Sequence, residues 1–206
     1  MSQNHESCFC KDQFNAYSDF IAHRRKKDGE VQSLWDHLLE TSRLSAVFAE
    51  KIGLRRHGEL LGLLHDLGKA SREFDQYIRS ATGLIDPDED DYVDAEEQKG
   101  KIDHSSAGAQ IIYNALSKKN KGNLAAEILS LVIASHHSGL IDCLTPDGVD
   151  NLSRRMNKSD EKTKITESYN NLVVPLKQKT EEILAEDSII EQINQKLKSL
   201  QEKNDS

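Results

Sequence analysis

The sequence feature that most constrains this chain is an apolar run that ends in two metal-binding side chains. Residues 60–64 read Leu-Leu-Gly-Leu-Leu, and His65, Asp66 and then Gly68-Lys69 follow at once. An imidazole and a carboxylate at the end of a buried segment are costly to remove from water unless a partner satisfies them. A metal ion is such a partner. The pair therefore predicts a metal site at a helix end, if other parts of the chain supply further ligands.

A helix is also predicted between Ser33 and Gly53. Ser33 is a favourable N-cap, Asp36 lies in the positive first turn, and Gly53 ends the segment. His37 falls on the side of the large apolar residues, so we expect it to point inward, either as a hydrogen-bonded core residue or as a metal ligand. The apolar residues that predict the buried face are Leu34, Leu38, Leu44, Val47, Phe48 and Ile52.

Three further histidines lie at the ends of predicted helices. His104 is part of the helix start at 103–106, and Gly108, one turn on, leaves room beside it for an ion or a substrate. His136 and His137 follow the next predicted helix, which is apolar. Each lies four residues after a residue expected in the core, so both should sit at the inner end of that helix. Packing alone does not readily explain two adjacent histidines there, which favours metal ligation.

These positions give six candidate metal ligands. Five imidazoles with one carboxylate suit iron, manganese, cobalt, nickel or zinc better than magnesium or calcium. They are too many for one catalytic ion that keeps an open position. They suit two ions roughly 4 Å apart, bridged by Asp66, that activate water for an in-line displacement at phosphorus. The six candidates are His37, His65, Asp66, His104, His136 and His137.

Lys69 follows the His-Asp pair by about one helical turn. It is predicted either to stabilise charge on a phosphate, as a catalytic residue beside Asp66, or to be an ordinary surface lysine. Gly62 and Gly68 do not form a nucleotide-binding P-loop with it, because five residues separate the glycines and Ala70 stands where Ser or Thr would coordinate magnesium. No nucleotide-triphosphate site is predicted.

The net charge of −8 at first argues against a nucleic-acid ligand. Eight of the 35 acidic residues lie between Asp86 and Glu97, however, and without this segment the acidic and basic counts are equal. A run of like charges repels itself, so we expect residues 86–100 to form a solvated, mobile loop, with a partner-docking tail or a mimic of DNA as the alternative. The basic run at 23–29 is expected to be a solvated loop, with phosphate contact as its alternative.

The sequence carries no signal for a membrane span or for export. Every apolar stretch is shorter than the roughly 18 residues of a span, and the N-terminus lacks the pattern of a signal peptide. Three cysteines, an odd count, are typical of a reducing compartment, so a cytoplasmic location is expected. Cys8 and Cys10 could be half of a zinc site, but no second pair of ligands stands near them.

The remaining segments also favour helices. Strand signals are weak throughout, so an all-α fold is predicted. Short helices are expected near 15–21, from Ser71 onward, and over 147–156. Residues 160–206 read as amphipathic helices that coat the domain. Their apolar stripe consists of Leu172, Val173, Leu176, Ile183, Leu184, Ile190, Ile193 and Leu197.

Three sequence blocks, taken in order, resemble one protein family. They read HDLGKA at 65–70, DHSSAGA at 103–109 and SHHSGL at 135–140. In these blocks the chain is similar to the HD metal-dependent phosphohydrolase superfamily. It is most like the HD nuclease domain of the CRISPR-associated helicase-nuclease of type I systems. The similarity covers about residues 33–142.

The resemblance implies a compact all-α HD-domain helical bundle with metal ligands at helix ends, a single domain over 1–206. It implies a metal-dependent nuclease that cuts single-stranded DNA in CRISPR interference, an antiviral defence. Its partners would be an RNA-guided surveillance complex and a helicase, fused or separate, whose domain does not lie within these residues. The implied ligand sets are His37, His65 and Asp66 for one ion, and Asp66, His104, His136 and His137 for the other.

The chain departs from the family at one ligand. The family usually adds a further aspartate to the first ion, from a late apolar helix. Asp160, Asp187 and Asp205 are the candidates, but none stands in such a helix, and Asp142 and Asp147 follow the double histidine too closely. The chain is therefore expected to be a separately encoded nuclease subunit or a fragment that ends before the last ligand.

Two other functions remain open from the sequence. One is an HD phosphohydrolase of small nucleotides or cyclic dinucleotides, which would share the metal ligands but need a closed pocket that reads base and ribose. The other is a metal-stabilised scaffold that docks a helicase, which the possible missing aspartate makes plausible.

Overall fold

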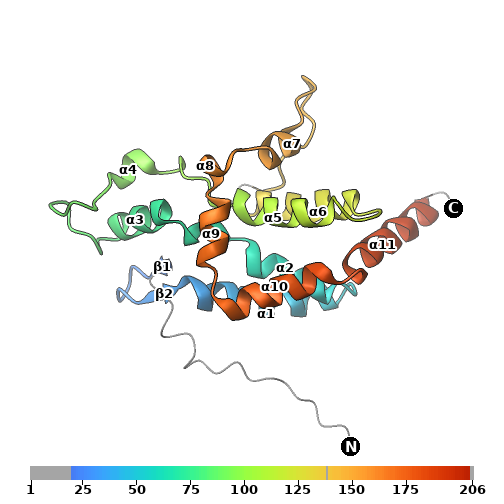
Figure 1. Ribbon diagram of the computed structural model, residues 1–206, viewed down its shortest axis with the longest axis horizontal. Helices are drawn as coiled ribbons and strands as arrows, with labels where there is room; N and C mark the ends of the chain where they lie inside the picture. Colours follow the sequence, from blue (N-terminus) through green and yellow to red (C-terminus); the bar gives the residue numbers. More distant parts are fainter. Residues whose placement is uncertain (1–19, 138, 205–206) are drawn as a thin grey trace, which may run out of the picture.

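The fold is mostly helical, with one small two-stranded sheet (Figure 1). The computed structural model describes residues 20–137 and 139–204. The all-α prediction is confirmed there, apart from that sheet. Cys8, Cys10, Asp205 and most of the helix predicted at 15–21 lie outside the described residues. The elements are β1 (Ile21–Arg24), β2 (Val31–Ser33), α1 (Leu34–Glu50), α2 (Arg55–Leu64), the 3-10 helix η2 (Leu67–Ala70), α3 (Arg72–Ala81), α4 (Ala95–Gln98), α5 (Ser106–Leu116), α6 (Asn123–Ser135), α7 (Asn151–Met156), α8 (Asp160–Thr163), α9 (Ile165–Asn171), α10 (Val174–Ala185) and α11 (Ser188–Asn204).

The helices α1 and α2 form a closely packed pair. Ser33 caps α1 as predicted, because its side chain accepts a hydrogen bond from the Asp36 amide. In α2, a Cβ atom on Gly58 or on Gly62 would lie 2.4 Å from a backbone atom of α1. Only glycine permits this approach, which brings the C-terminal end of α2 alongside the first turns of α1.

The predicted buried face of α1 is wrong in its second half. Leu34 and Leu38 are fully buried. Beyond them, the small side chains of Ser42 and Ala46 are buried, because the glycines of α2 bring the two backbones too close for large residues. The large residues therefore turn outward, and those that are more than half exposed are Leu44, Val47, Phe48 and Ile52.

The second helix pair, α5 and α6, contacts α2. A Cβ atom on Gly108 of α5 would lie 1.9 Å from the Leu64 carbonyl oxygen. The space beside Gly108 is therefore filled by the backbone of α2, and the prediction that it is left open for an ion or a substrate is wrong. On α6, Leu129 and Ile133 are buried as expected, whereas Val132 is 45% exposed.

A β-hairpin precedes α1, where the sequence predicted the end of a helix and a solvated basic loop. β1 and β2 pair antiparallel, with Ile21 opposite Ser33 and His23 opposite Gln32. Between these two pairs β1 has one residue more than β2, so the ladder contains a bulge at Ala22. Both predictions are therefore wrong at residues 21–24, which form a strand.

The acidic segment at 86–100 follows α3 and contains the short helix α4. Its side chains are mostly exposed, and Figure 1 shows it at the end of the molecule that carries α3. Two hydrogen bonds join it to α3: Gln76 Nε2 donates to Asp91 Oδ1 at 3.2 Å, and the Val93 amide donates to Ser80 Oγ at 3.2 Å. The segment is solvated as predicted, while its mobility stays a prediction.

The helices after α6 pack against the α1–α2 and α5–α6 pairs. α9 contacts η2, α10 contacts α2 and α5, and α11 contacts α6. Within the described part of the chain, no helix combines the length and the apolar character that a bilayer span requires. The apolar side chains of these last helices belong to the same continuous core as those of the two pairs. Members of the predicted stripe that are buried are Leu172, Val173, Leu176, Ile183, Ile190 and Ile193.

Candidate metal centre

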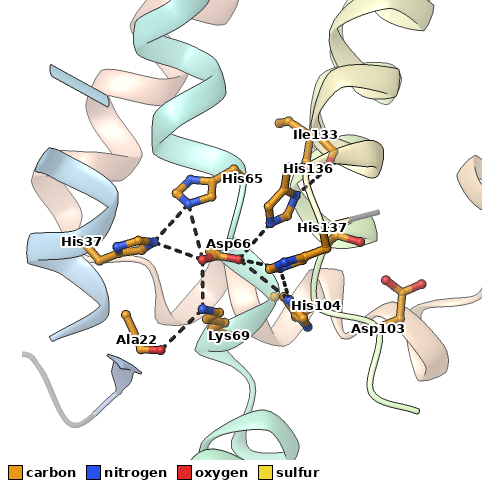
Figure 2. A network of polar contacts seen from close by, with 12 residues as sticks. Ala22, His37, His65, Asp66, Lys69, Asp103, His104, Ile133, His136 and His137 are labelled. Carbon is orange, nitrogen blue, oxygen red and sulfur yellow. Dashed lines mark hydrogen bonds and ion pairs between the residues drawn. The ribbon is translucent and has the colours of Figure 1, made fainter. Parts of the chain in front are cut away.

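Asp66 lies at the centre of a cluster of histidines, in the short turn between α2 and η2. Its side chain is 4% exposed, and Figure 2 shows imidazoles approaching it from both sides. All six residues that the sequence singled out are brought together here, although they come from four separate segments of the chain. The six are His37, His65, Asp66, His104, His136 and His137.

The two carboxylate oxygens of Asp66 face different histidines. Oδ2 lies 3.1 Å from His37 Nε2 and 3.3 Å from His65 Nε2. We call this the Oδ2 side. Oδ1 lies 3.2 Å from His136 Nε2, 3.5 Å from His137 Nε2 and 3.8 Å from His104 Nε2. We call this the Oδ1 side, and its four residues form one group of potential metal ligands.

Two of the imidazoles are oriented by the helices that end beside them. His65 Nδ1 donates to the Gly62 carbonyl at 2.9 Å, and His136 Nδ1 donates to the Ile133 carbonyl at 2.6 Å. Carbonyls in the last turn of a helix lack the regular partner four residues on, so they can accept such bonds. The Ile133 carbonyl also accepts from the His136 backbone amide at 3.3 Å. Since a carbonyl only accepts, Nδ1 carries a proton in both rings, and Nε2 is the ring nitrogen that faces Asp66.

Pairs of Nε2 atoms also approach one another. The distance is 3.1 Å between His37 and His65 and 2.5 Å between His104 and His137. A neutral imidazole has one lone pair and one N–H, so the protons available cannot satisfy every close contact among these nitrogens. Convergent imidazole lone pairs around a carboxylate are the donor set of a divalent transition metal. The residues present therefore fit such an ion.

His104 is held in place by its backbone neighbours. The Gly68 amide donates to the His104 carbonyl at 3.2 Å, and a Cβ atom on Gly68 would lie 2.3 Å from that oxygen. On the other side, Asp103 accepts from the Ser106 amide at 3.0 Å and pairs with Lys158. The glycine of the HDLGKA block thus allows the turn after Asp66 to lie against His104.

Lys69 is buried within the site, which excludes its reading as a surface lysine. Its side chain is 4% exposed, and Nζ lies 2.9 Å from Asp66 Oδ2. Nζ also donates to the Ala22 carbonyl at 3.4 Å and lies 5.6 Å from the centre of the Phe74 ring. The Oδ2 side therefore contains a fixed ammonium group beside its imidazoles.

The surroundings shift the protonation of several groups toward the forms that bind metal. Burial alone would raise the pKa of Asp66, but hydrogen bonds from the imidazoles, that of His136 foremost, and the Lys69 charge hold it far below its ordinary value. Burial lowers the pKa of His104 to about 4. Burial and then the neighbouring His136 also lower the pKa of His137. A deprotonated carboxylate and neutral imidazoles are the ligand forms.

His23 is a potential ligand that the sequence did not single out. It forms a second ligand group with His37 and Asp66, in which the ligand atoms lie within 4.8 Å of one another. Burial, followed by the charge of Lys69, lowers the pKa of His23. In the sequence it stands in a basic run, and only the unpredicted hairpin brings it to the site.

None of the described candidates for a further aspartate reaches the centre. Asp187 is 87% exposed and pairs with Lys119, and Asp160 is exposed at the start of α8. Asp142 and Asp147 also stand outside both ligand groups, and among residues 20–137 and 139–204 these groups contain no carboxylate other than Asp66.

An apolar groove of about 480 Å³ borders the site between α1, α2 and α6. His65 and His136 form part of its wall, and Phe48 of α1 and Ile52, just after that helix, line it as well. Its only other polar side chains are Thr41 and Ser45. The groove therefore offers few groups that could recognise the polar edges of a small nucleotide.

The chain matches one family model, described as "Cas3, HD domain", over residues 17–200. The match includes every residue of the cluster around Asp66, together with His23 and Lys69. No curated protein matches the chain.

Proposed function

The chain belongs to the Cas3 HD-domain family, and we propose that it is a metal-dependent nuclease that hydrolyses the phosphodiester bonds of single-stranded DNA. It would act in CRISPR interference with a helicase, on DNA exposed by an RNA-guided surveillance complex. The observation that carries this proposal is the division of the site at Asp66, whose two oxygens face separate sets of imidazole Nε2 atoms.

The two ions would be held by the residues on the two sides of Asp66. His37 and His65 share Oδ2 of Asp66, and the three histidines of the other side share Oδ1. When bound, a pair of divalent ions activates water and neutralises charge on the phosphate that is attacked. The imidazole-rich donor set favours iron, manganese, cobalt, nickel or zinc.

The protein itself contributes orientation and a fixed positive charge. The bonds from Nδ1 of His65 and His136 to helix carbonyls keep both rings aimed at Asp66 before any ligand arrives. Lys69 Nζ, held by Asp66 and the Ala22 carbonyl, lies where it would stabilise charge that develops on a phosphate. Asp66 and Lys69 are therefore the proposed catalytic residues.

A polymer fits the surroundings of the site better than a small nucleotide does. The neighbouring groove is apolar and lacks the set of polar groups that would read a base and a ribose. The acidic surplus of the chain lies in the exposed segment at 86–97. Most contacts with the DNA backbone would come from the helicase and the surveillance complex.

The test uses protein stripped of metal and then loaded separately with manganese, cobalt, nickel, iron(II) or zinc. We expect cleavage of circular single-stranded DNA with at least one of these ions, and none in the stripped protein or with calcium. Circular double-stranded DNA, cyclic dinucleotides and mononucleotides serve as competing substrates. Turnover of nucleotides without cleavage of DNA would establish the small-molecule phosphohydrolase instead. Full metal occupancy without hydrolysis of any phosphodiester would establish a scaffold.

A further inference from the structure

The two sides of Asp66 are unequal in the number of ligands that the sequence predicts. The Oδ1 side has three imidazoles, and the Oδ2 side has those of His37 and His65 only. In the described part of the chain no other carboxylate belongs to a ligand group with Asp66. If both oxygens serve an ion, the Oδ2 side has room for one more ligand.

His23 approaches the Oδ2 side from the hairpin. Its ring packs edge-to-face on His37, with 4.9 Å between the ring centres and 84° between the ring planes. The ligand atoms of His23, His37 and Asp66 lie within 4.8 Å of one another. Metal–nitrogen bonds of about 2.1 Å place two ligands of one ion up to about 4 Å apart. Because His23 is exposed, a rotation of its ring would close the remaining distance.

The bulge in β1 directs His23 toward the site. In a regular strand His23 would point to the same face as the buried Ile21, but the extra residue Ala22 interrupts that alternation. Ile21 and Ala22 are both buried, and the Ala22 carbonyl accepts from Lys69 Nζ. The strand is therefore fixed against the site by contacts that do not involve the His23 side chain.

The β1–β2 hairpin and the first turn of α1 form one local unit, which carries both His23 and His37. The Leu34 amide, at the start of α1, donates to the Phe20 carbonyl at 2.9 Å. The Phe20 ring also packs edge-on against Trp35, with 6.0 Å between the ring centres. The hairpin is thus joined to the first turn of the helix that presents His37, so the spacing between the two imidazoles is set by this unit.

We infer that His23 is the fourth protein ligand of the ion on the Oδ2 side. This rests on the two-ion centre of the proposed function. Each ion would then have three imidazoles and one oxygen of Asp66. Four protein ligands fill the tetrahedral shell of zinc, whereas an ion with six positions keeps two of them for water and substrate. A catalytic ion with open positions on the Oδ2 side would therefore be manganese, iron, cobalt or nickel rather than zinc.

The experiment compares metal binding by the wild-type chain, His23→Ala and His23→Asp, with Gln32→Ala as the matched control. Gln32 lies opposite His23 in the hairpin, and its side chain bonds Glu40 on the surface, so its loss perturbs the same ladder without removing an imidazole. Metal content by mass spectrometry and titration calorimetry with cobalt(II) give the number of ions and their affinities. Thermal unfolding of the metal-free proteins checks that each variant is folded.

We expect the wild type, Gln32→Ala and His23→Asp to bind two ions. His23→Ala should keep one ion at wild-type affinity and bind the other at least about tenfold more weakly, with a changed visible spectrum for the second cobalt. Two ions bound by His23→Ala with wild-type affinities would overturn the inference, as would a wild type that binds fewer than two. If the variants follow the expected pattern and DNA is not cleaved, the proposed function fails while the ligand assignment stands.

Discussion

The two sides of Asp66 differ in what stands beside the shared carboxylate. On the Oδ1 side three imidazoles face the oxygen, from the ends of α5 and α6. On the Oδ2 side the Lys69 ammonium lies 2.9 Å from the oxygen, together with His37 and His65. An ion bound on the Oδ2 side would therefore share the carboxylate with a fixed positive charge. Like charges a few ångströms apart repel each other strongly when they are buried, because screening is weak there.

This difference suggests a division of roles. The Oδ1 side would bind its ion more tightly, since three imidazoles face Oδ1 and the Lys69 ammonium contacts the other oxygen. The Oδ2 side would place a second positive group where a phosphate arrives, and this would lower the affinity for its own ion. We expect the ion on the Oδ1 side to bind first and the ion on the Oδ2 side to bind more weakly.

The largest effect should follow from Asp66→Asn, which removes the charge that both sides share. An amide is a poor bridge between two cations, so we expect both ions to be lost and DNA cleavage to fall by about four orders of magnitude. Metal content and the initial rate on circular single-stranded DNA measure this. Asp187→Asn, at an aspartate that is 87% exposed, is the control. A variant that keeps one ion at full affinity would show that Asp66 does not serve both sides.

The second largest effect should come from variants that each remove a metal ligand from only one side of Asp66. His137→Ala should remove the ion on the Oδ1 side and His37→Ala the ion on the Oδ2 side, each leaving one ion and lowering the cleavage rate about a thousandfold. Because His137 is 51% exposed, its truncation leaves the core intact. Calorimetry should show loss of the tighter site in the first variant and of the weaker site in the second. Loss of the same metal-binding site in both variants would contradict the assignment of His137 and His37 to different sides of Asp66.

Lys69→Met tests directly whether the Lys69 ammonium competes with an ion for Asp66 Oδ2. Removing the ammonium should strengthen binding of the ion on the Oδ2 side at least about tenfold, since the repulsion between like charges is gone. It should also lower kcat about a hundredfold, because a fixed positive group at the phosphate is lost. Lys119→Met, remote from the centre on the surface, provides the comparison for both quantities. Weaker metal binding in Lys69→Met would mean that the lysine supports the site rather than competing in it.

Acid should destabilise the metal-free protein through His104. Burial lowers its folded pKa to about 4, below the ordinary value of 6.5, so the unfolded chain binds more protons between these values. The stability that neutral His104 contributes is present above pH 6.5 and is lost as the pH falls toward 4. We expect the free energy of unfolding to drop by about 2 kcal/mol more between pH 7 and pH 5 in the wild type than in His104→Gln.

Urea unfolding at the two pH values measures this last difference. The buried His57, whose pKa burial also lowers, adds an acid sensitivity of the same sign. It is common to both proteins and therefore cancels in the comparison. Identical pH dependence of the two proteins would show that His104 titrates near its ordinary value.

The sequence predicted the site better than it predicted the surfaces around it. Asp66 and the five histidines around it could be predicted because each lies at a helix end or on an inward face, where a polar metal-binding side chain is costly unless a partner satisfies it. His23 could not, because it stands in a run of basic residues with no apolar pattern. Its position depends on a hairpin and a bulge that weak strand signals did not indicate.

The errors in helix packing share one physical cause. Periodicity assigns the largest apolar residues to the buried face, but close backbone approach at Gly62 and Gly108 reverses that preference locally. On α1 the small Ser42 and Ala46 are buried and Phe48 is exposed. Beside Gly108 the space is occupied by the Leu64 carbonyl. Such contacts depend on which helices meet, which a single sequence does not specify.

The central claim is that Asp66 bridges two ions, and electron paramagnetic resonance of the manganese(II)-loaded chain tests it most directly. Two manganese ions that share one carboxylate are exchange-coupled, so we expect two ions per chain and a coupled, multiline spectrum. The same measurement on His137→Ala should give one ion with the six-line spectrum of isolated manganese(II). A six-line spectrum from the wild type, at one or at two ions per chain, would contradict the bridge.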